Sequence, residues 1–374
     1  MDTAIVTTRM LERDAMGNFT MASMAALRKL GEVSVYTLSY ERPAIDGVKV
    51  RLLGHRNGHG LDTNLQALMD TRKLARELAG FDVLVIVGPD LGSMPAYHLA
   101  KKYNPKLKVM WTFHGFTPAA YMGSLKDRWF MRVRTAASFR SIKHAGLIQV
   151  FSNSMKNEVI RRGIDPAKVT VMPLGIDIGG MANGNGRRIR EKYGVEDRFL
   201  LLYVGRLERF KHVDELIMAV AKAEGVALVV IGRGPERDRL EKLAADLGLG
   251  DRVKFAGFVP DAELPDYYAA CDAFATASRH EGFCVPIVEA MAAGKPSIVP
   301  ALAAMPETAG DAGLTYPSSD VDGLVKKVRE LQENKVLYER LAANARARAP
   351  VFRMPAVMER YVRLVEDFYR MSPS

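Results

Sequence analysis

The sequence predicts an α/β protein made of two doubly wound domains, each with a parallel sheet between layers of helices. The chain has 374 residues, and at roughly 100–200 residues per domain this length suggests two domains. Short β-branched runs alternate with longer segments of helical period, as expected of strands that are buried on both faces and joined by helices. The alternation restarts after residue 195, so we expect two such series.

The first domain is expected to span residues 1–177. Its apolar runs have the length and composition of buried strands, and segments of helical period, including residues 22–30 and 71–78, lie between them. The strands are expected at residues 4–8, 33–38, 48–53, 83–87, 109–113, 147–151 and 169–173.

The second domain is expected to span residues 190–350. The Gly/Asn-rich stretch 179–186 has no apolar period and is expected to be an exposed linker or loop. Residues 354–374 follow the second series, and their apolar spacing over 354–368 predicts a C-terminal helix. The strands of the second domain are expected at residues 199–204, 227–231, 253–255, 273–276 and 297–300.

Composition excludes several classes of protein. With 48% hydrophobic and 26% charged residues, the chain can bury a large core and is not mainly disordered or fibrous. Its two cysteines, Cys271 and Cys284, are too few for a disulfide framework or a cysteine-rich zinc site. No apolar run approaches the ~18 residues of a membrane span, and the N-terminal residues lack the basic start of a signal peptide. We therefore expect a cytoplasmic protein.

The positive net charge of +10 is concentrated in the first half of the chain. Residues 1–174 hold 25 Lys and Arg against 14 Asp and Glu, whereas residues 175–374 hold 28 against 29. An anionic partner of the first domain is therefore expected. Nucleic acid is not favoured, because no recognition motif accompanies the charge.

One segment of the first domain combines cations with aromatic residues over the length of a long helix. This pattern is typical of a helix that lies on an anionic membrane surface. An ordinary solvated helix with aromatic core contacts would give the same pattern. The residues concerned are Lys126, Arg128, Trp129, Phe130, Arg132, Arg134, Phe139, Arg140 and Lys143.

Several common site motifs are missing. After the first strand, residues 10–19 contain a single glycine, Gly17, so the G-x-G-x-x-G fingerprint of nicotinamide enzymes is absent. No H-E-x-x-H, G-x-S-x-G or P-loop sequence occurs. Asp320 and Asp322 have the spacing of a metal-binding pair, but they precede a helical segment, which favours a helix cap over metal ligation.

The most informative segment is 278–296, which lies between two expected strands and has the pattern strand–loop–helix–strand. Gly282 allows the backbone to approach a ligand closely. The amides of Cys284, Val285 and Ile287 are expected to be free at the helix start, where the helix dipole is positive. Such a helix start binds an anion such as a phosphate.

Two carboxylates, Glu281 and Glu289, flank this anion site. Carboxylates accept hydrogen bonds from vicinal hydroxyls, so the pair could hold two polyols on either side of a phosphate, as in a sugar nucleotide. Alternatively, Glu289 only complements the helix dipole and Glu281 is a solvated surface group. Arg206 and Lys211 follow another strand at its carboxyl end, where open sheets bind ligands, and could grip a diphosphate. As solvated surface cations, they would be unremarkable.

Glu281 and Glu289 in the context H-E-G-F-C-V-P-I-V-E-A-M-A-A-G-K-P resemble the E-x7-E signature of retaining glycosyltransferases of family 4. Residues 205–211 are similar to the G-R-L-x-x-x-K segment of that family, residues 232–235 to its G-x-G-P turn, and residues 173–177 to its P-x-G-[IV]-D segment. The resemblance covers essentially the whole chain and weakens in the first half. It implies the GT-B fold, with two Rossmann-like domains facing a central cleft and a last helix that returns to the first domain.

The resemblance also implies roles for single residues. Glu289 is expected to accept hydrogen bonds from the ribose and Glu281 from the donor sugar, while Arg206 and Lys211 bind the diphosphate. Gly282, Phe283, Cys284 and Val285 are expected to place their amides against the hexose and diphosphate.

Four more positions match less firmly. Gly232 lies in the matched glycine turn of the donor site, Phe258 matches a position beside the nucleobase, and Gly17 matches a phosphate contact. His114 is expected to orient the donor sugar. Phe258 as plain core and His114 as a structural hydrogen-bonding group are the alternatives.

The expected activity is transfer of a hexosyl group from a nucleoside-diphosphate sugar to an acceptor hydroxyl with retention, without a metal or other cofactor. GDP-mannose is the first choice of donor, and a UDP-glucosyl or UDP-N-acetylglucosaminyl donor is the alternative. The acceptor, lipid-linked or a glycan, is expected on the first domain, with the protein peripheral at the inner membrane face. A sugar-nucleotide 2-epimerase and a non-catalytic sugar-nucleotide sensor remain open. The oligomeric state is not predicted.

Overall fold

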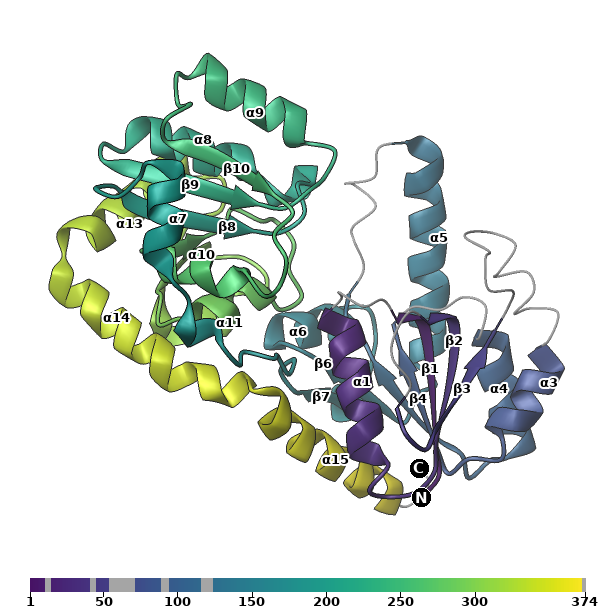
Figure 1. Ribbon diagram of the computed structural model, residues 1–374. Helices are drawn as coiled ribbons and strands as arrows, with labels where there is room; N and C mark the ends of the chain where they lie inside the picture. The colour runs from purple at the N-terminus through teal and green to yellow at the C-terminus, as the bar shows by residue number, and fades with distance from the viewer. Residues whose placement is uncertain (11–14, 41–44, 54–70, 89–93, 116–123, 372–374) are drawn as a thin grey trace. The chain divides into compact units, whose positions relative to one another are not determined.

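Two parallel sheets, each with its own helices, organise the chain (Figure 1). The computed structural model describes residues 1–10, 15–40, 45–53, 71–88, 94–115 and 124–371. The chain divides into unit 1, formed by Met1–Ile176 and Met354–Ser374, and unit 2, formed by Asp177–Arg353. The predicted α/β class with two doubly wound sheets is confirmed.

Unit 1 contains a sheet that, over the described residues, has seven strands in the order β3-β2-β1-β4-β5-β6-β7. All neighbouring strands are parallel. The strand order reverses between β1 and β4. The elements are β1 (Thr3–Met10), α1 (Ala15–Leu27), β2 (Val33–Tyr40), β3 (Val48–Leu52), α3 (Thr71–Leu78), β4 (Val83–Val87), α4 (Met94–Tyr103), β5 (Lys108–Thr112), α5 (Leu125–Ile142), β6 (Leu147–Val150), α6 (Asn153–Arg161), β7 (Val169–Val171) and α15 (Met354–Arg370).

The C-terminal helix α15 packs on α1 of unit 1 (Figure 1). Phe19 of α1 meets Tyr361 of α15 edge to face, with ring centroids 5.5 Å apart. Both side chains are fully buried, so each contributes a large apolar area to this core. The amide of Met354 donates to the carbonyl of Ile176 over 3.0 Å, which attaches the start of α15 to the end of the first chain segment.

Unit 2 contains a sheet of six described strands in the order β10-β9-β8-β11-β12-β13, again all parallel. Here the order reverses between β8 and β11. The elements are α7 (Gly186–Tyr193), β8 (Phe199–Val204), α8 (Val213–Lys222), β9 (Val226–Ile231), α9 (Arg237–Asp246), β10 (Val253–Gly257), α10 (Leu264–Ala270), β11 (Ala273–Ala275), α11 (Val285–Ala292), β12 (Ser297–Pro300), α12 (Met305–Ala309), β13 (Gly313–Tyr316), α13 (Val321–Glu333) and α14 (Lys335–Arg348).

The Gly/Asn-rich stretch 179–186 is mostly exposed and lies next to the division between the units, as predicted, but part of it is packed closely. It contains a short 3-10 helix, Met181–Asn183, whose first residue is buried. A Cβ on Gly184 would lie 1.9 Å from the carbonyl oxygen of Pro265, and one on Gly186 would lie 2.6 Å from the backbone of α10. These glycines therefore allow close packing against α10, and lack of a side chain, rather than flexibility, explains them.

None of the described helices combines the length and the apolar composition that crossing a membrane requires. The longest helix of unit 1, α5, has four large apolar side chains exposed to solvent, and these are considered below.

Candidate active site

The predicted donor-site residues of unit 2 lie at the carboxyl ends of the strands, where the strand order of the sheet reverses. β8 and β11 are neighbours there, and each begins a connection to the opposite side of the sheet order. Ligands of open α/β sheets bind outside the carboxyl ends of the strands at such a point. The loop after β8 carries Arg206 and Lys211, and the loop after β11 carries Glu281. The cations and the carboxylate thus lie together at the carboxyl ends of two neighbouring strands.

The two loops are joined directly. The amide of Arg279 donates to the carbonyl of Phe210 over 2.8 Å, and Nζ of Lys211 lies 2.5 Å from Oε1 of Glu281. Both side chains of this ion pair are only 16% exposed. The family resemblance assigned Glu281 to the donor sugar and Lys211 to the diphosphate, and in the structure the two side chains also contact each other.

The start of α11 (Val285–Ala292) provides the backbone amides of the site. Cys284 caps the helix in the left-handed region, with φ of 70°. Its carbonyl accepts the amide of Ile287 over 3.1 Å, so the expectation that the Ile287 amide is free is wrong. The carbonyl of Phe283 accepts from the hydroxyl of Thr308 over 2.7 Å, which fixes the preceding loop. The amides of Cys284 and Val285 are the donors at this helix start that suit an anion.

The electrostatic surroundings of Cys284 show that the predicted charges converge on this helix start. Burial raises the pKa of its thiol well above the usual value, and the neighbouring Glu281 and Glu289 raise it further while Lys211 lowers it. The geometry agrees with this, since Lys211 contacts Glu281 directly and Glu289 lies on α11 itself.

Glu289 is partly buried on α11 and is held by a residue that the sequence did not indicate. The hydroxyl of Tyr268 donates to its Oε2 over 2.6 Å. Tyr268 lies on α10 and is fully buried. Burial raises the pKa of Glu289, and the hydrogen bond from Tyr268 lowers it. The sequence shows two adjacent tyrosines before β11, but nothing in it indicates which hydroxyl turns toward Glu289.

Arg206 is placed differently from Lys211. Its guanidinium is 69% exposed and pairs with Glu208, the shortest distance being 3.2 Å. Its backbone carbonyl accepts from the buried hydroxyl of Tyr203 over 3.0 Å. The loop backbone is thus fixed while the guanidinium stays in solvent, where an exposed pair contributes little to stability.

The turns after β8, β9 and β10 stack through their backbones. Gly232 has φ of 141°, and a Cβ there would lie 1.8 Å from the carbonyl oxygen of Gly205. Its amide donates to the carbonyl of Gly257 over 2.8 Å. Only glycine permits this approach. Phe258, the next residue, is 43% exposed, which excludes the alternative that it is plain core, and the guanidinium of Arg233 lies 5.1 Å from its ring centroid.

Gly17 and His114 belong to unit 1. Gly17 is buried in the first turn of α1. His114 follows β5, is partly exposed, and lies against Gly88 at the end of β4, where a Cβ would be 2.4 Å from Nε2 of His114. Gly17 and Gly88 come after β1 and β4, the two strands at the reversal of the unit 1 sheet, and His114 follows the neighbouring strand β5. This is the position that a ligand site of unit 1 would take.

Asp320 caps a helix, as expected. Oδ1 of Asp320 accepts from the amide of Gly323 over 2.8 Å at the start of α13. Across the described parts of the chain, no group of three or more His, Cys, Asp or Glu residues is arranged to hold a metal ion. Both cysteines are buried and free.

Comparison with known proteins agrees with this geometry. A family model described as Glycosyl transferases group 1 matches residues 186–348, and one described as Glycosyltransferase Family 4 matches residues 16–179. The chain is 29% identical over 270 residues to O-antigen chain mannosyltransferase B of Escherichia coli, covering 68% of this chain and 70% of that protein.

Two further proteins illustrate the range of the similarity. A GDP-mannose-dependent alpha-(1-6)-phosphatidylinositol monomannoside mannosyltransferase of Mycolicibacterium smegmatis is 33% identical over 257 residues, 60% of this chain and 67% of that protein. The crystal structure of Anabaena Alr3699/HepE in complex with UDP superposes with a TM-score of 0.79 at 20% identity, covering 98% of this chain and 100% of that one. At that identity the likeness concerns the fold.

Two parallel doubly wound units, in agreement with the solved structure, give the chain the GT-B fold. The chain belongs to glycosyltransferase family 4, and it is a hexosyltransferase. The predicted family and enzyme class are thus confirmed.

Proposed function

We propose that the protein transfers a hexosyl group from a nucleoside-diphosphate sugar to an acceptor hydroxyl with retention of configuration. The observation that carries this proposal is the contact of Lys211 with Glu281 at the sheet reversal of unit 2, just before α11, which carries Glu289. A diphosphate needs cations and amides, and sugars need acceptors for their hydroxyls. Both kinds of group are present at this point of the sheet.

Each part of the donor has a partner among these residues. The diphosphate binds the amides at the loop and helix start, Gly282 to Val285, together with Lys211 and Arg206. Lys211 carries three N–H donors, so its bond to Glu281 leaves two for phosphate oxygens. Glu289 accepts from the ribose, and Glu281 accepts from the hexose.

The remaining roles rest on the family resemblance and stay predictions. The exposed ring of Phe258 is assigned to the nucleobase, which it can contact by stacking. Gly232 shapes the neighbouring turn. In unit 1, Gly17 is assigned to phosphate and His114 to the donor sugar.

The proposed chemistry needs stabilisation of negative charge. The bond between the anomeric carbon and the diphosphate oxygen breaks, a bond from that carbon to the acceptor oxygen forms on the same face, and the acceptor proton passes to the leaving phosphate. Charge grows on the diphosphate, where Lys211 and the α11 amides are fixed in advance. A preorganised donor of this kind is worth about 3–4 kcal/mol. These donors supply the role of a metal, so we expect activity to survive a chelator.

GDP-mannose is our first choice of donor. It is supported by the relatives from Escherichia coli and Mycolicibacterium smegmatis, which are named as mannosyltransferases, the second as GDP-mannose-dependent. The Anabaena protein was solved with UDP, which keeps a UDP-glucosyl or UDP-N-acetylglucosaminyl donor as the alternative.

The acceptor is proposed to be lipid-linked or a glycan, presented at an anionic membrane surface that the protein contacts peripherally through α5. Leu125, Trp129 and Val133 of α5 are 82%, 67% and 46% exposed, and their spacing of four residues places them on one helix face. Phe130 is also exposed, whereas Phe139 is buried and belongs to the core. Five cations of this segment are exposed, namely Lys126, Arg128, Arg132, Arg140 and Lys143.

Vesicle flotation tests the membrane contact. Each cation near anionic headgroups contributes about 1 kcal/mol, so the protein should float with vesicles that contain phosphatidylglycerol and not with phosphatidylcholine alone. Trp129→Ser should reduce flotation, whereas Val336→Ser, which removes an apolar side chain that is 79% exposed in unit 2, should not. Equal flotation with both vesicles would exclude the membrane proposal.

Titration calorimetry with GDP-mannose, UDP-glucose and UDP-N-acetylglucosamine tests the donor site. Lys211→Ala and Glu289→Ala should each weaken the affinity for the bound donor at least ~10-fold, the scale of a charge-assisted hydrogen bond. Lys222→Ala serves as the control, because Lys222 pairs with Asp322 on the surface of the same unit. Wild-type affinity in both site variants would refute the site.

Turnover separates the transferase from its alternatives. Diphosphate release that depends on an added lipid or glycan acceptor supports the transferase. Conversion of one sugar nucleotide into another without acceptor would indicate the 2-epimerase, and donor binding without any turnover would indicate a sensor.

A further inference from the structure

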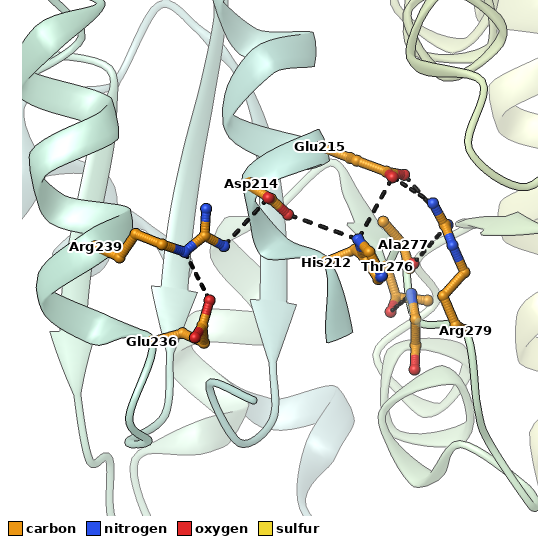
Figure 2. A network of polar contacts seen from close by, with 9 residues as sticks. His212, Asp214, Glu215, Glu236, Arg239, Thr276, Ala277 and Arg279 are labelled. Atoms are coloured by element: carbon orange, nitrogen blue, oxygen red, sulfur yellow. Dashed lines mark hydrogen bonds and ion pairs between the residues drawn. The ribbon is translucent and has the colours of Figure 1, made fainter. Parts of the chain in front are cut away.

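A second, more deeply buried ion pair joins residues that lie close in sequence to Lys211 and Glu281. The guanidinium of Arg279 donates through Nη1 to Oε2 of Glu215 over 3.3 Å and through Nη2 to Oε1. Nη1 also donates to the carbonyl of Ala277 over 3.2 Å. The side chains of Arg279 and Glu215 are 12% and 10% exposed. Figure 2 shows the pair at one end of a chain of polar contacts.

This pair connects the start of α8, which follows the loop that carries Lys211, with the loop that carries Glu281. Glu215 lies in the first turn of α8, four residues after Lys211, and Arg279 lies two residues before Glu281. The amide of Arg279 also donates to the carbonyl of Phe210. Three links therefore join the loop after β8 and the start of α8 to the loop after β11: one of backbone, one buried ion pair, and the ion pair of the proposed donor site.

The network extends from Glu215 to the turn that begins α8. His212 adopts φ of 46°, which is unusual for a residue with a side chain. Its Nδ1 lies 3.6 Å from Oε1 of Glu215 and 3.9 Å from Oδ1 of Asp214. Asp214 in turn pairs with Arg239 over 3.1 Å (Figure 2). The turn that follows Lys211 is thus also fixed by the contacts of His212 and Asp214 with their neighbours.

Buried ion pairs contribute little net stability, because desolvation of the charges offsets their attraction, and apolar pairs of similar size are often as stable. The two charges nevertheless remain close together, since either one alone would be buried without compensation. Such a pair fixes distance and orientation more than it stabilises the fold. Here the fixed distance is the distance between the loops that carry Lys211 and Glu281.

We propose that Arg279 and Glu215 are positioning residues, which hold Lys211 against Glu281 in the orientation that binds the donor diphosphate. This inference rests on the proposed function. Neither residue touches the donor, so their effect on binding passes through Lys211.

A double-mutant cycle in donor affinity tests the inference. The measured quantity is the Kd of GDP-mannose or UDP-glucose, whichever the wild-type protein binds more tightly. Arg279→Met should weaken binding about 10-fold or more, because displacement of a charged group by about 1 Å is enough to lose its contact. In the Lys211→Ala background the same change should weaken binding less than about 3-fold. Equal losses in both backgrounds would overturn the inference.

A second variant separates positioning from folding. The double variant Glu215→Leu/Arg279→Met replaces the pair by apolar side chains and is expected to unfold thermally near the wild-type temperature. Its donor affinity should still be about 10-fold weaker. Wild-type affinity in this variant would show that the pair is merely structural. Lys222→Met, which breaks the exposed pair with Asp322 at the other end of α8, is the matched control and should leave affinity unchanged.

The outcomes distinguish this inference from the proposed function. Undiminished donor affinity in Lys211→Ala, or no binding of either sugar nucleotide by the wild-type protein, would refute the donor site and the inference together. A weakened Lys211→Ala variant combined with additive losses in the cycle would refute the positioning role alone.

Discussion

Tyr268→Phe removes one hydroxyl from the interior of unit 2 and leaves the ring in place. That hydroxyl donates to Glu289 over 2.6 Å, and Tyr268 is fully buried, so water cannot readily replace it. A hydrogen bond to a charged group contributes about 1.5–3 kcal/mol. We expect the free energy of unfolding to fall by that amount at neutral pH. At about 2–4 °C per kcal/mol for a unit of this size, the melting temperature should fall by about 3–12 °C.

The pH dependence of this loss follows from the pKa of Glu289. Burial raises that pKa above its usual value and the Tyr268 hydrogen bond lowers it, so in Tyr268→Phe the pKa is raised further. A carboxyl whose pKa is raised on folding binds more protons in the native state, and stability falls as pH rises through the window between the unfolded and folded values. This fall in stability with rising pH should be larger in Tyr268→Phe than in wild type. The difference from wild type should therefore be greatest at neutral pH and shrink in acid.

Urea unfolding at neutral and at mildly acidic pH measures both effects, and donor affinity at the two pH values gives an independent readout. As the pH is lowered, donor binding should begin to weaken at a higher pH in the variant than in wild type, because the proposed contact needs the ionised carboxylate of Glu289. Tyr267→Phe is the control, since its neighbouring hydroxyl contacts Tyr193 and Lys192 instead. A loss below about 0.5 kcal/mol, or an equal loss at both pH values, would refute the reasoning.

Three other substitutions or treatments have defined outcomes. Gly232→Ala should destabilise the protein by more than about 2 kcal/mol, because its φ is 141° and the new Cβ would meet the Gly205 carbonyl; Gly250→Ala, with no atom within 4 Å of a Cβ, should be nearly neutral in the same thermal unfolding assay. The Cys284 thiol, whose pKa burial raises, should react with iodoacetamide only after unfolding, and peptide mapping that finds it alkylated in the folded protein would contradict this. Asp320→Ala should cost about 1 kcal/mol of unfolding free energy through loss of the helix cap, and an unchanged urea midpoint would contradict the cap.

The fold could be predicted largely because buried parallel strands are short apolar runs. The expected strands at 83–87, 199–204 and 297–300 have the same bounds in the structure. β13 (Gly313–Tyr316) was missed, since only its last residue is buried and the run is neither long nor β-branched. The helix predicted from residue 22 begins at Ala15 in the structure. The exposure of residues 179–186 was predicted, but the close packing of Gly184 and Gly186 against α10 was not, because sequence does not show whether a glycine provides flexibility or close packing.

The part of the site that could be predicted consists of residues that lie close together in one segment of the sequence. Glu281, Glu289 and the start of α11 are close in sequence, so their spacing indicated an anion site. Tyr268 and Arg279 could not be assigned, because their partners depend on which strands are neighbours and on how buried side chains turn. The direct contact between Lys211 and Glu281 likewise follows from strand order, which places β11 beside β8.

The division of unit 1 into two chain segments has a consequence for biosynthesis. Unit 1 needs α15, yet 177 residues of unit 2 lie between Ile176 and Met354. At about 5–20 residues per second, a ribosome takes roughly 10–35 s to translate them. During that time Phe19 lacks the aromatic ring of Tyr361 that covers it in the finished protein. A nascent chain therefore exposes this apolar face of α1 until the last helix emerges.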